Sequence, residues 1–315
     1  MNRAARWRAD LALTFIAVVW GATFVLVKQA LLDISTMYFL ALRFGLASVS
    51  MLALFLPAFR RMPAPALWRG LRGGAVAGGF LALGYVLQTF GLKYTSAGNS
   101  GFLTGLYIVL VPLFGAAVFR RWPQARELFG VLVATAGLVV LTLPSIGGGF
   151  SFAGFNRGDL LTIGCAIAFA GHLLVLGYYS QRERIEAVAI GQIACAAVLF
   201  GVSLFVEPPK ATWSQPVISA LLVTSIFGTA VAFAVQTWAQ QFTTATRTAL
   251  IFALEPVVAL LTAILAGGEQ LTTAAVVGGA LILAGIVTVE IKPSRRMVCE
   301  KSLYTEGTAA GKVLD

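Results

Sequence analysis

The sequence predicts an all-α integral membrane protein whose ten transmembrane helices form two inverted five-helix repeats. First, 58% of the 315 residues are hydrophobic and 11% are charged, whereas soluble domains carry about a quarter charged residues. Second, apolar segments close to the ~20 residues that a membrane-spanning helix needs recur along the whole chain. Third, one constant offset aligns the two halves of the chain with each other.

Each half of the chain contains five of these apolar segments. We expect them at residues 11–31, 37–57, 73–92, 97–118, 128–144, 159–179, 187–206, 217–237, 248–266 and 272–290. The first segment follows the basic stretch MNRAARWRAD, which superficially resembles a secretory signal. We expect it to remain as a membrane helix, because its apolar run is longer than that of a typical signal and its opening Asp10-Leu11 recurs as Asp159-Leu160.

The positions of the basic residues predict the orientation. With the N-terminus in the cytoplasm, only Lys93, Arg157 and Lys210 of the 23 Lys and Arg residues fall in external loops, and Lys28 and Arg43 fall within spans. All other basic residues then face the cytoplasm, as the positive-inside rule requires. We therefore expect a multi-pass protein of the inner (plasma) membrane with both termini in the cytoplasm. The net charge of +10 is then a topology signal, and nucleic acid is not an expected partner.

The two halves match each other at an offset of 148 residues. The matching positions are Gln88-Thr89 with Gln236-Thr237, Thr95 with Thr243, Ala97 with Ala245, Gly130 with Gly278, and Gly137 with Gly285. Because five spans are an odd number, the second half must be inverted relative to the first, and the substrate site is expected near the midplane where the halves meet. We expect one repeat at residues 9–144, a second at 157–291 and a polar cytoplasmic tail at 292–315.

Several motifs resemble the EamA-type exporters of the drug/metabolite transporter superfamily. They are Trp20-Gly21 with Phe24, Arg43, YTSAGNSGFLTGLYIVLVPLF at 94–114, FTTATRTALIFALEPVVALL at 242–261, Gly268-Glu269 and GGALILAGIV at 278–287. The resemblance extends from about residue 9 to 291. It implies export of a metabolite, but related exporters carry amino acids, purine-like compounds, vitamins or nucleotide-linked sugars, so the fold does not settle the cargo. One departure is that Arg120-Arg121-Trp122-Pro123 stands where such repeats often carry Glu, so only Glu269 keeps that acidic position.

Charged groups within spans are candidates for the substrate site, because burying them in lipid costs at least ~2.5 kcal/mol each. Arg43 would either form a structural ion pair or clamp a substrate carboxylate with its guanidinium fork. Glu255 precedes Pro256, where we expect the helix to kink. Its carboxylate would bind a cationic group or take up a proton, or else pair with a buried arginine. Lys28 is expected to snorkel to the interface.

Four polar residues occupy positions that the repeat makes equivalent. Gln88 and Gln236 would line both walls of one site, or would hold helices together by hydrogen bonds that average ~0.6 kcal/mol in membranes. Asn99 and Arg247 mark opposite mouths of the inverted pair. They would act in gating or substrate entry, or would only cap helices and anchor them at the interface.

The remaining candidates are one histidine and four aromatic residues. His172, the single histidine, would couple transport to protons because imidazole changes charge near neutral pH, or it would be a hydrogen-bonded packing residue. Aromatic side chains could stack on an apolar or aromatic cargo, or they could face lipid. These candidates are Trp20, Tyr85, Tyr107 and Trp238.

Glycines spaced along single helix faces predict close helix packing. The pairs are Gly130 with Gly137, Gly278 with Gly285, Gly74 with Gly78, and Gly101 with Gly105. A homodimer formed through the fifth and tenth helices is a further hypothesis from the same pattern.

The absence of catalytic motifs argues against an enzyme. The sequence has no HExxH and no GxxxxGK[ST] motif, and no channel filter stands out. We expect no cofactor or metal. The partners expected are a small-molecule substrate and membrane lipids. The predicted function is a secondary active transporter that exports a small metabolite, an amino acid or related compound, by alternating access driven by a substrate or proton gradient. The alternatives are an importer of a metabolite and an efflux carrier for drug-like or nucleobase-like compounds.

Overall fold

A computed structural model describes residues 3–92, 94, 103–120, 122–142, 156–205, 207–265 and 271–290. Its helices are α1 (Arg3–Ala30), α2 (Thr36–Arg60), α3 (Ala64–Leu92), α5 (Tyr107–Phe119), α6 (Ala125–Thr142), α7 (Arg157–Ser180), α8 (Ile185–Ser203), α9 (Gln215–Ser225), the π-helix η3 (Ile226–Val231), α10 (Ala232–Ala239), α11 (Ala245–Phe252), α12 (Leu254–Leu265) and α13 (Thr273–Glu290). Asn99, Glu269 and the predicted tail lie outside the described residues.

The all-α membrane class is confirmed. Within the described ranges, seven helical segments are long and apolar enough to cross a membrane: 4–27, 36–60, 64–91, 157–180, 185–203, 215–239 and 245–262. Shorter apolar helices occupy 103–119 and 273–289. In the described part of the chain the sole β feature is an isolated bridge between Ile34 and Ala211. Helices predominate because backbone groups in lipid must find hydrogen-bond partners within their own segment.

Two helices start earlier than hydropathy indicates. The first helix begins at Arg3, ahead of the predicted start at residue 11, and the third begins at Ala64, ahead of residue 73. Both extensions carry arginines, among them Arg6, Arg8 and Arg69. Hydropathy marks only the part of a helix that crosses lipid, so the polar turns beyond the lipid were missed.

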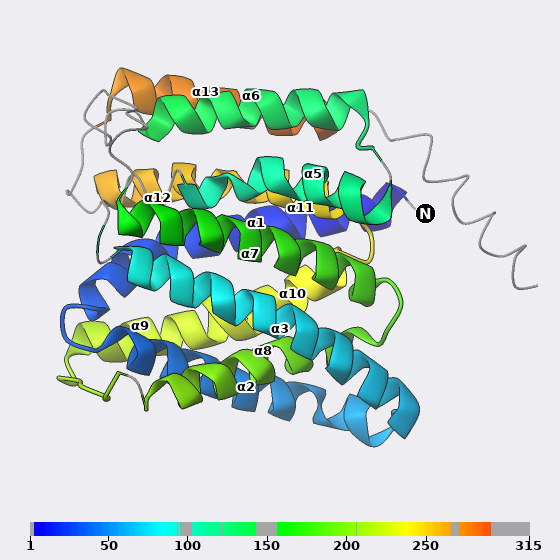
Figure 1. Ribbon diagram of the computed structural model, residues 1–315, viewed down its shortest axis with the longest axis vertical. Coiled ribbons are helices and arrows are strands. Elements are labelled where there is room, and N and C mark those ends of the chain that lie inside the picture. Colours follow the sequence, from blue (N-terminus) through cyan, green and yellow to red (C-terminus); the bar gives the residue numbers. More distant parts are fainter. Residues whose placement is uncertain are drawn as a thin grey trace, which may run out of the picture.

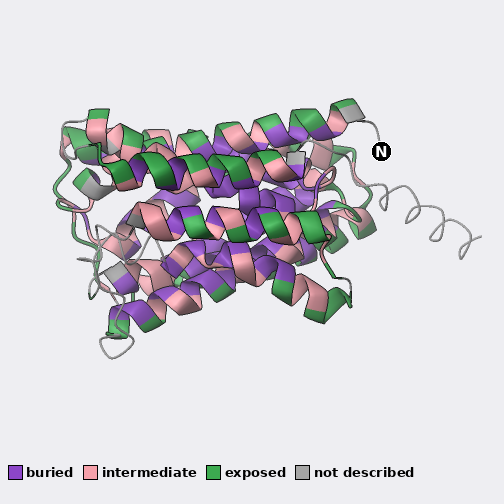
Figure 2. Ribbon diagram, turned by 90° about the horizontal axis from the view of Figure 1, so that it is seen from above, coloured by how far each residue is buried: buried purple, intermediate pink, exposed green. Residues whose placement is uncertain are grey.

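The helices lie side by side and the chain reverses direction at two opposite ends of the bundle (Figure 1). α6 and α13 form a pair at the top edge of this view, and α2, α8 and α9 lie at the bottom edge, with α1, α3 and α7 between them. Buried residues face the interior of this bundle, and exposed residues face outward (Figure 2). Many of the exposed side chains are apolar, including Leu54, Val198 and Val276. Such an outer surface suits contact with lipid.

Two glycine crossings hold α6 against α13. A Cβ atom added to Gly130 would lie 2.8 Å from the Gly285 carbonyl oxygen, and one added to Gly285 would lie 2.6 Å from that of Gly130. Gly137 and Gly278 make the same reciprocal contact, at 2.6 and 2.7 Å. The predicted close packing therefore occurs within one chain. A homodimer remains a prediction, and it would have to use other faces of these two helices.

A candidate substrate site at the centre of the bundle

The run of helix from α9 to α10 widens into a π-helix at residues 226–231. The Gly228 carbonyl oxygen accepts two hydrogen bonds there, from Nη2 of Arg43 at 3.1 Å and from Nε1 of Trp20 at 2.8 Å. The Thr229 hydroxyl accepts a third, from Nε of Arg43 at 2.7 Å. π-Helical turns are frequent at functional sites because they break the regular backbone ladder. Here the π-helix anchors two side chains that the sequence marked as candidates.

Aromatic rings surround these anchored groups. The Trp20 ring lies 4.9 Å from that of Phe252 and 5.4 Å from that of Phe233, centroid to centroid. The Arg43 guanidinium carbon lies 5.6 Å from the centre of the Tyr85 ring, within the range of a cation–π contact. Arg43 is 6% exposed. Its charge is therefore accommodated by a carbonyl, a hydroxyl and ring faces.

The ninth apolar segment is broken beside Pro256, as predicted. α11 ends at Phe252, and α12 begins at Leu254, so Glu255 lies in the first turn of α12. The corresponding segment of the first half is also interrupted, by a turn at Leu106 immediately before α5. A carboxylate in the first turn of a helix faces the positive end of the helix dipole.

Glu255 faces the central group from α12. It interacts electrostatically with Arg43 of α2, Tyr85 of α3, Tyr107 of α5 and Cys165 of α7. Its carboxylate forms no hydrogen bond or ion pair with any residue that the structure describes. The predicted direct pairing with an arginine is thus not found among those residues.

The repeat relates several of the polar candidates to each other. An offset of 148 residues relates Tyr107 to Glu255 and Gln88 to Gln236. Gln88 donates from Nε2 to the Thr104 hydroxyl at 3.3 Å. Gln236 is 1% exposed, and its Oε1 has no hydrogen-bond partner among the described atoms. The two equivalent amides therefore have different environments.

His172 forms part of a hydrogen-bonded chain across three helices. Its Nε2 lies 2.8 Å from Oε1 of Gln192, whose Nε2 donates to the Thr237 hydroxyl at 2.9 Å. Thr237 in turn donates to the Phe233 carbonyl at 2.6 Å. Because the Thr237 proton is used there, the Gln192 amide must present its oxygen to His172, and the imidazole is the donor. These hydrogen bonds connect α7, α8 and α10. His172 therefore has the environment of a hydrogen-bonded packing residue, the second of the two roles considered for it.

Arg247 lies apart from this centre, at the end of the bundle that carries the N-terminus. Its Nε and Nη2 donate to Oδ1 and Oδ2 of Asp10 at 3.0 and 2.8 Å, and its Nη1 donates to the Val289 carbonyl at 3.3 Å. Sequence analysis missed Asp10 as the partner. The recurrence of Asp10 as Asp159 indicates that each residue precedes an apolar span, but it does not indicate a partner. Asp159 forms a capping box with Asn156 at the start of α7. Trp238, the remaining aromatic candidate, packs against Phe242, with the two ring centroids 5.4 Å apart.

A polytopic helical bundle with a charged, aromatic-lined centre at a broken helix is the architecture of a membrane transport protein. The sequence profile of the EamA-like transporter family matches residues 7–143 and again residues 156–291. The chain belongs to this family.

Relatives agree with this assignment. An "uncharacterized transporter" of Archaeoglobus fulgidus is 33% identical over 91% of this chain and 87% of its own length. A "probable amino-acid metabolite efflux pump" of Salmonella typhimurium is 25% identical over 86% of this chain and 91% of its own. A solved crystal structure has a TM-score of 0.72 with 22% identity, covering 90% of this chain and 96% of the solved chain. The last similarity concerns the fold alone.

Proposed function

We propose that this transporter is a secondary active exporter of a small metabolite, an amino acid or a closely related compound. The observation that carries the proposal is the carboxylate of Glu255, which has no hydrogen-bond or ion-pair partner among the described residues and lies at a helix break near the anchored guanidinium of Arg43. A zwitterion matches this arrangement, because its ammonium group binds the carboxylate and its carboxylate binds the remaining N–H donors of Arg43. The name of the Salmonella relative favours the same cargo class.

Ten spans in two inverted repeats, at residues 9–144 and 157–291, form part of this proposal. The family profile matches once in each half. Contacts also recur in equivalent pairs: Trp20 packs on Phe233 at 5.4 Å, and Phe169 packs on Tyr85 at 5.7 Å. Phe169 follows Trp20 by 149 residues, as Asp159 follows Asp10, and Phe233 follows Tyr85 by 148. Such a repeat supports alternating access, because each half can adopt the shape of the other.

Residues of the centre take distinct roles in this mechanism. Trp20, Tyr85 and Tyr107 supply ring faces for the apolar part of the cargo. Glu255 exchanges the cargo ammonium for a proton, which couples export to the proton gradient. The groups that face Glu255 and tune this exchange are Arg43, Tyr85, Tyr107 and Cys165.

The proposed location is the inner membrane, with both termini in the cytoplasm. The N-terminus, the α2–α3 turn and the α7–α8 turn lie at one end of the bundle (Figure 1). That end carries basic residues, including Arg61, Arg69, Arg182 and Arg184. The positive-inside rule assigns such an end to the cytoplasm.

Counterflow in liposomes tests the proposal. The purified protein is reconstituted into liposomes loaded with unlabelled amino acids, and entry of labelled amino acids is followed with and without a pH gradient. In the wild type and in the control variant Glu183→Gln, we expect saturable counterflow whose rate changes when a pH gradient is imposed. In Glu255→Gln, we expect saturable counterflow whose rate does not change with the pH gradient. No counterflow from folded protein would refute the amino-acid cargo and favour a nucleobase-like or drug-like compound, which the aromatic centre would also accept. Counterflow without a pH response in the wild type would refute proton coupling alone.

A further inference from the structure

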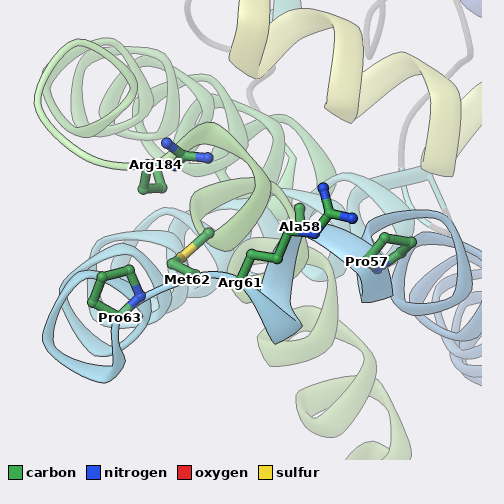
Figure 3. A pocket seen from close by; sticks show the side chains of 6 residues that line it. All are labelled: Pro57, Ala58, Arg61, Met62, Pro63 and Arg184. Atoms are coloured by element: carbon green, nitrogen blue, oxygen red, sulfur yellow. The ribbon is translucent and has the colours of Figure 1, made fainter.

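A basic hollow lies at the end of the bundle that carries the N-terminus, between the α2–α3 turn and the start of α8 (Figure 3). It has a volume of about 380 Å³ and is lined by Pro57, Ala58, Arg61, Met62, Pro63 and Arg184. This volume lies within the roughly 300–1,000 Å³ typical of sites for small ligands. The two arginines come from opposite halves of the chain, so one ligand here would touch both halves.

The charges around the hollow favour an anion. Arg61 is exposed, and no described residue forms an ion pair or hydrogen bond with its guanidinium. Among the described residues, Arg184 pairs with Glu186 alone, at 3.4 Å, and the Arg184 side chain is 59% exposed. An exposed pair of this kind is weak and is readily exchanged for another anion. Arg184 also immediately precedes α8, whose first turn has no side-chain cap and carries one carboxylate, that of Glu186. With Arg61 and Arg184 against this single carboxylate, the hollow keeps a net positive charge.

The surroundings of the hollow distinguish a lipid from a free anion. In the turns before Pro57, α2 exposes the apolar side chains Leu52, Leu54 and Leu56. Beyond the hollow, α3 exposes Trp68, which is 71% accessible and is a residue type that anchors helices at the membrane interface. The hollow therefore lies where a lipid-facing helix surface meets a cluster of arginines. Only a molecule with both an anionic head and an acyl chain matches both parts.

We propose that this hollow binds the headgroup of an anionic phospholipid. The guanidinium groups of Arg61 and Arg184 hold the phosphate, and the acyl chains follow the apolar surface of α2. Basic pockets between transmembrane helices on the cytoplasmic side bind anionic headgroups in this way. The bound lipid connects the α2–α3 turn to the start of α8 and so links the two halves of the transporter.

Native mass spectrometry of the full chain in detergent tests the proposal, with phosphatidylglycerol, phosphatidylcholine and inorganic phosphate as separate probes. We expect the wild type to retain phosphatidylglycerol in preference to phosphatidylcholine. Arg61→Gln/Arg184→Gln should weaken that retention about tenfold or more, since each basic residue near the surface contributes to anionic lipid binding. The control Arg69→Gln/Arg182→Gln removes the same charge from the same end and should retain the lipid.

Three results would overturn the proposal: equal retention of the two lipids by the wild type, equal loss in the control and the test variant, or displacement of phosphatidylglycerol by millimolar inorganic phosphate. The last result would indicate a site for free anions. Arg61→Lys/Arg184→Lys keeps both charges and guards against a folding defect, because it should retain most of the lipid and should unfold at the same temperature as the wild type.

Discussion

Arg247 and Asp10 lie 237 positions apart in the sequence and form a bidentate ion pair in the folded chain. Both side chains are 7% exposed. The pair joins α1 to α11, and the bond from Arg247 to the Val289 carbonyl adds α13. The pair thus connects helices from both halves of the chain at the end that carries the N-terminus. This is a structural role, and it places Arg247 outside the central site.

Breaking the ion pair between Asp10 and Arg247 should destabilise the protein. Asp10→Asn or Arg247→Gln removes one charge of a buried ion pair, which costs about 3–5 kcal/mol. The double variant should lose less than the sum of the two single variants, because it removes both charges. Thermal unfolding in detergent measures the change. Arg69→Gln is the control, since its pair with Glu183 is exposed and contributes about 0–1 kcal/mol. If Asp10→Asn is as stable as the control, the ion pair does not stabilise the fold.

The approximate positions of the described helices were predictable because apolar runs must form helices in lipid, but the early starts of α1 and α3 were not. The break at Pro256 was predictable because proline removes a backbone donor. The partners of Arg43 were not predictable: one is the Gly228 carbonyl, which is exposed by a π-helical turn that has no signal in the sequence. The pairing of Asp10 with Arg247 was not predictable either, because hydropathy does not indicate which charged side chains at the helix ends form an ion pair.

The crossing of α6 and α13 predicts a sharp response to one methyl group. In Gly137→Ala the new Cβ would lie 2.6 Å from the Gly278 carbonyl oxygen, so the two helices must separate, at a cost of about 1–3 kcal/mol. Gly79→Ala is the matched control, because nothing lies within 4 Å of a Cβ atom there. It should be neutral, or stabilising by up to about 1 kcal/mol through helix propensity. The unfolding temperatures of both variants decide the question, and a neutral Gly137→Ala would rule out tight packing at the crossing.

The position of His172 predicts a structural effect without a change in pH response. His172→Phe removes the donor to Gln192 and leaves a buried amide oxygen unpaired, which costs about 1–3 kcal/mol. The dependence of counterflow on pH should match that of the wild type, in contrast to Glu255→Gln. Stability and pH profile are therefore measured on the same preparation. A flattened pH profile in His172→Phe with unchanged stability would instead assign the proton to the histidine.

The anchoring of Arg43 predicts that a positive charge alone does not suffice at that position. Lysine cannot reach the Thr229 hydroxyl and the Gly228 carbonyl with a planar fork while keeping further donors for cargo. Arg43→Lys should lower kcat/KM for counterflow at least about tenfold, a change equivalent to about 1.4 kcal/mol.

Trp20→Phe is the matched comparison. It removes one hydrogen bond to the same carbonyl but keeps an aromatic ring against Phe233 and Phe252. We expect a loss of stability of about 0.5–1.5 kcal/mol with a smaller effect on kcat/KM. If Arg43→Lys transports as well as the wild type, the guanidinium geometry is dispensable, and the central site must recognise its cargo through the Glu255 carboxylate and the aromatic rings alone.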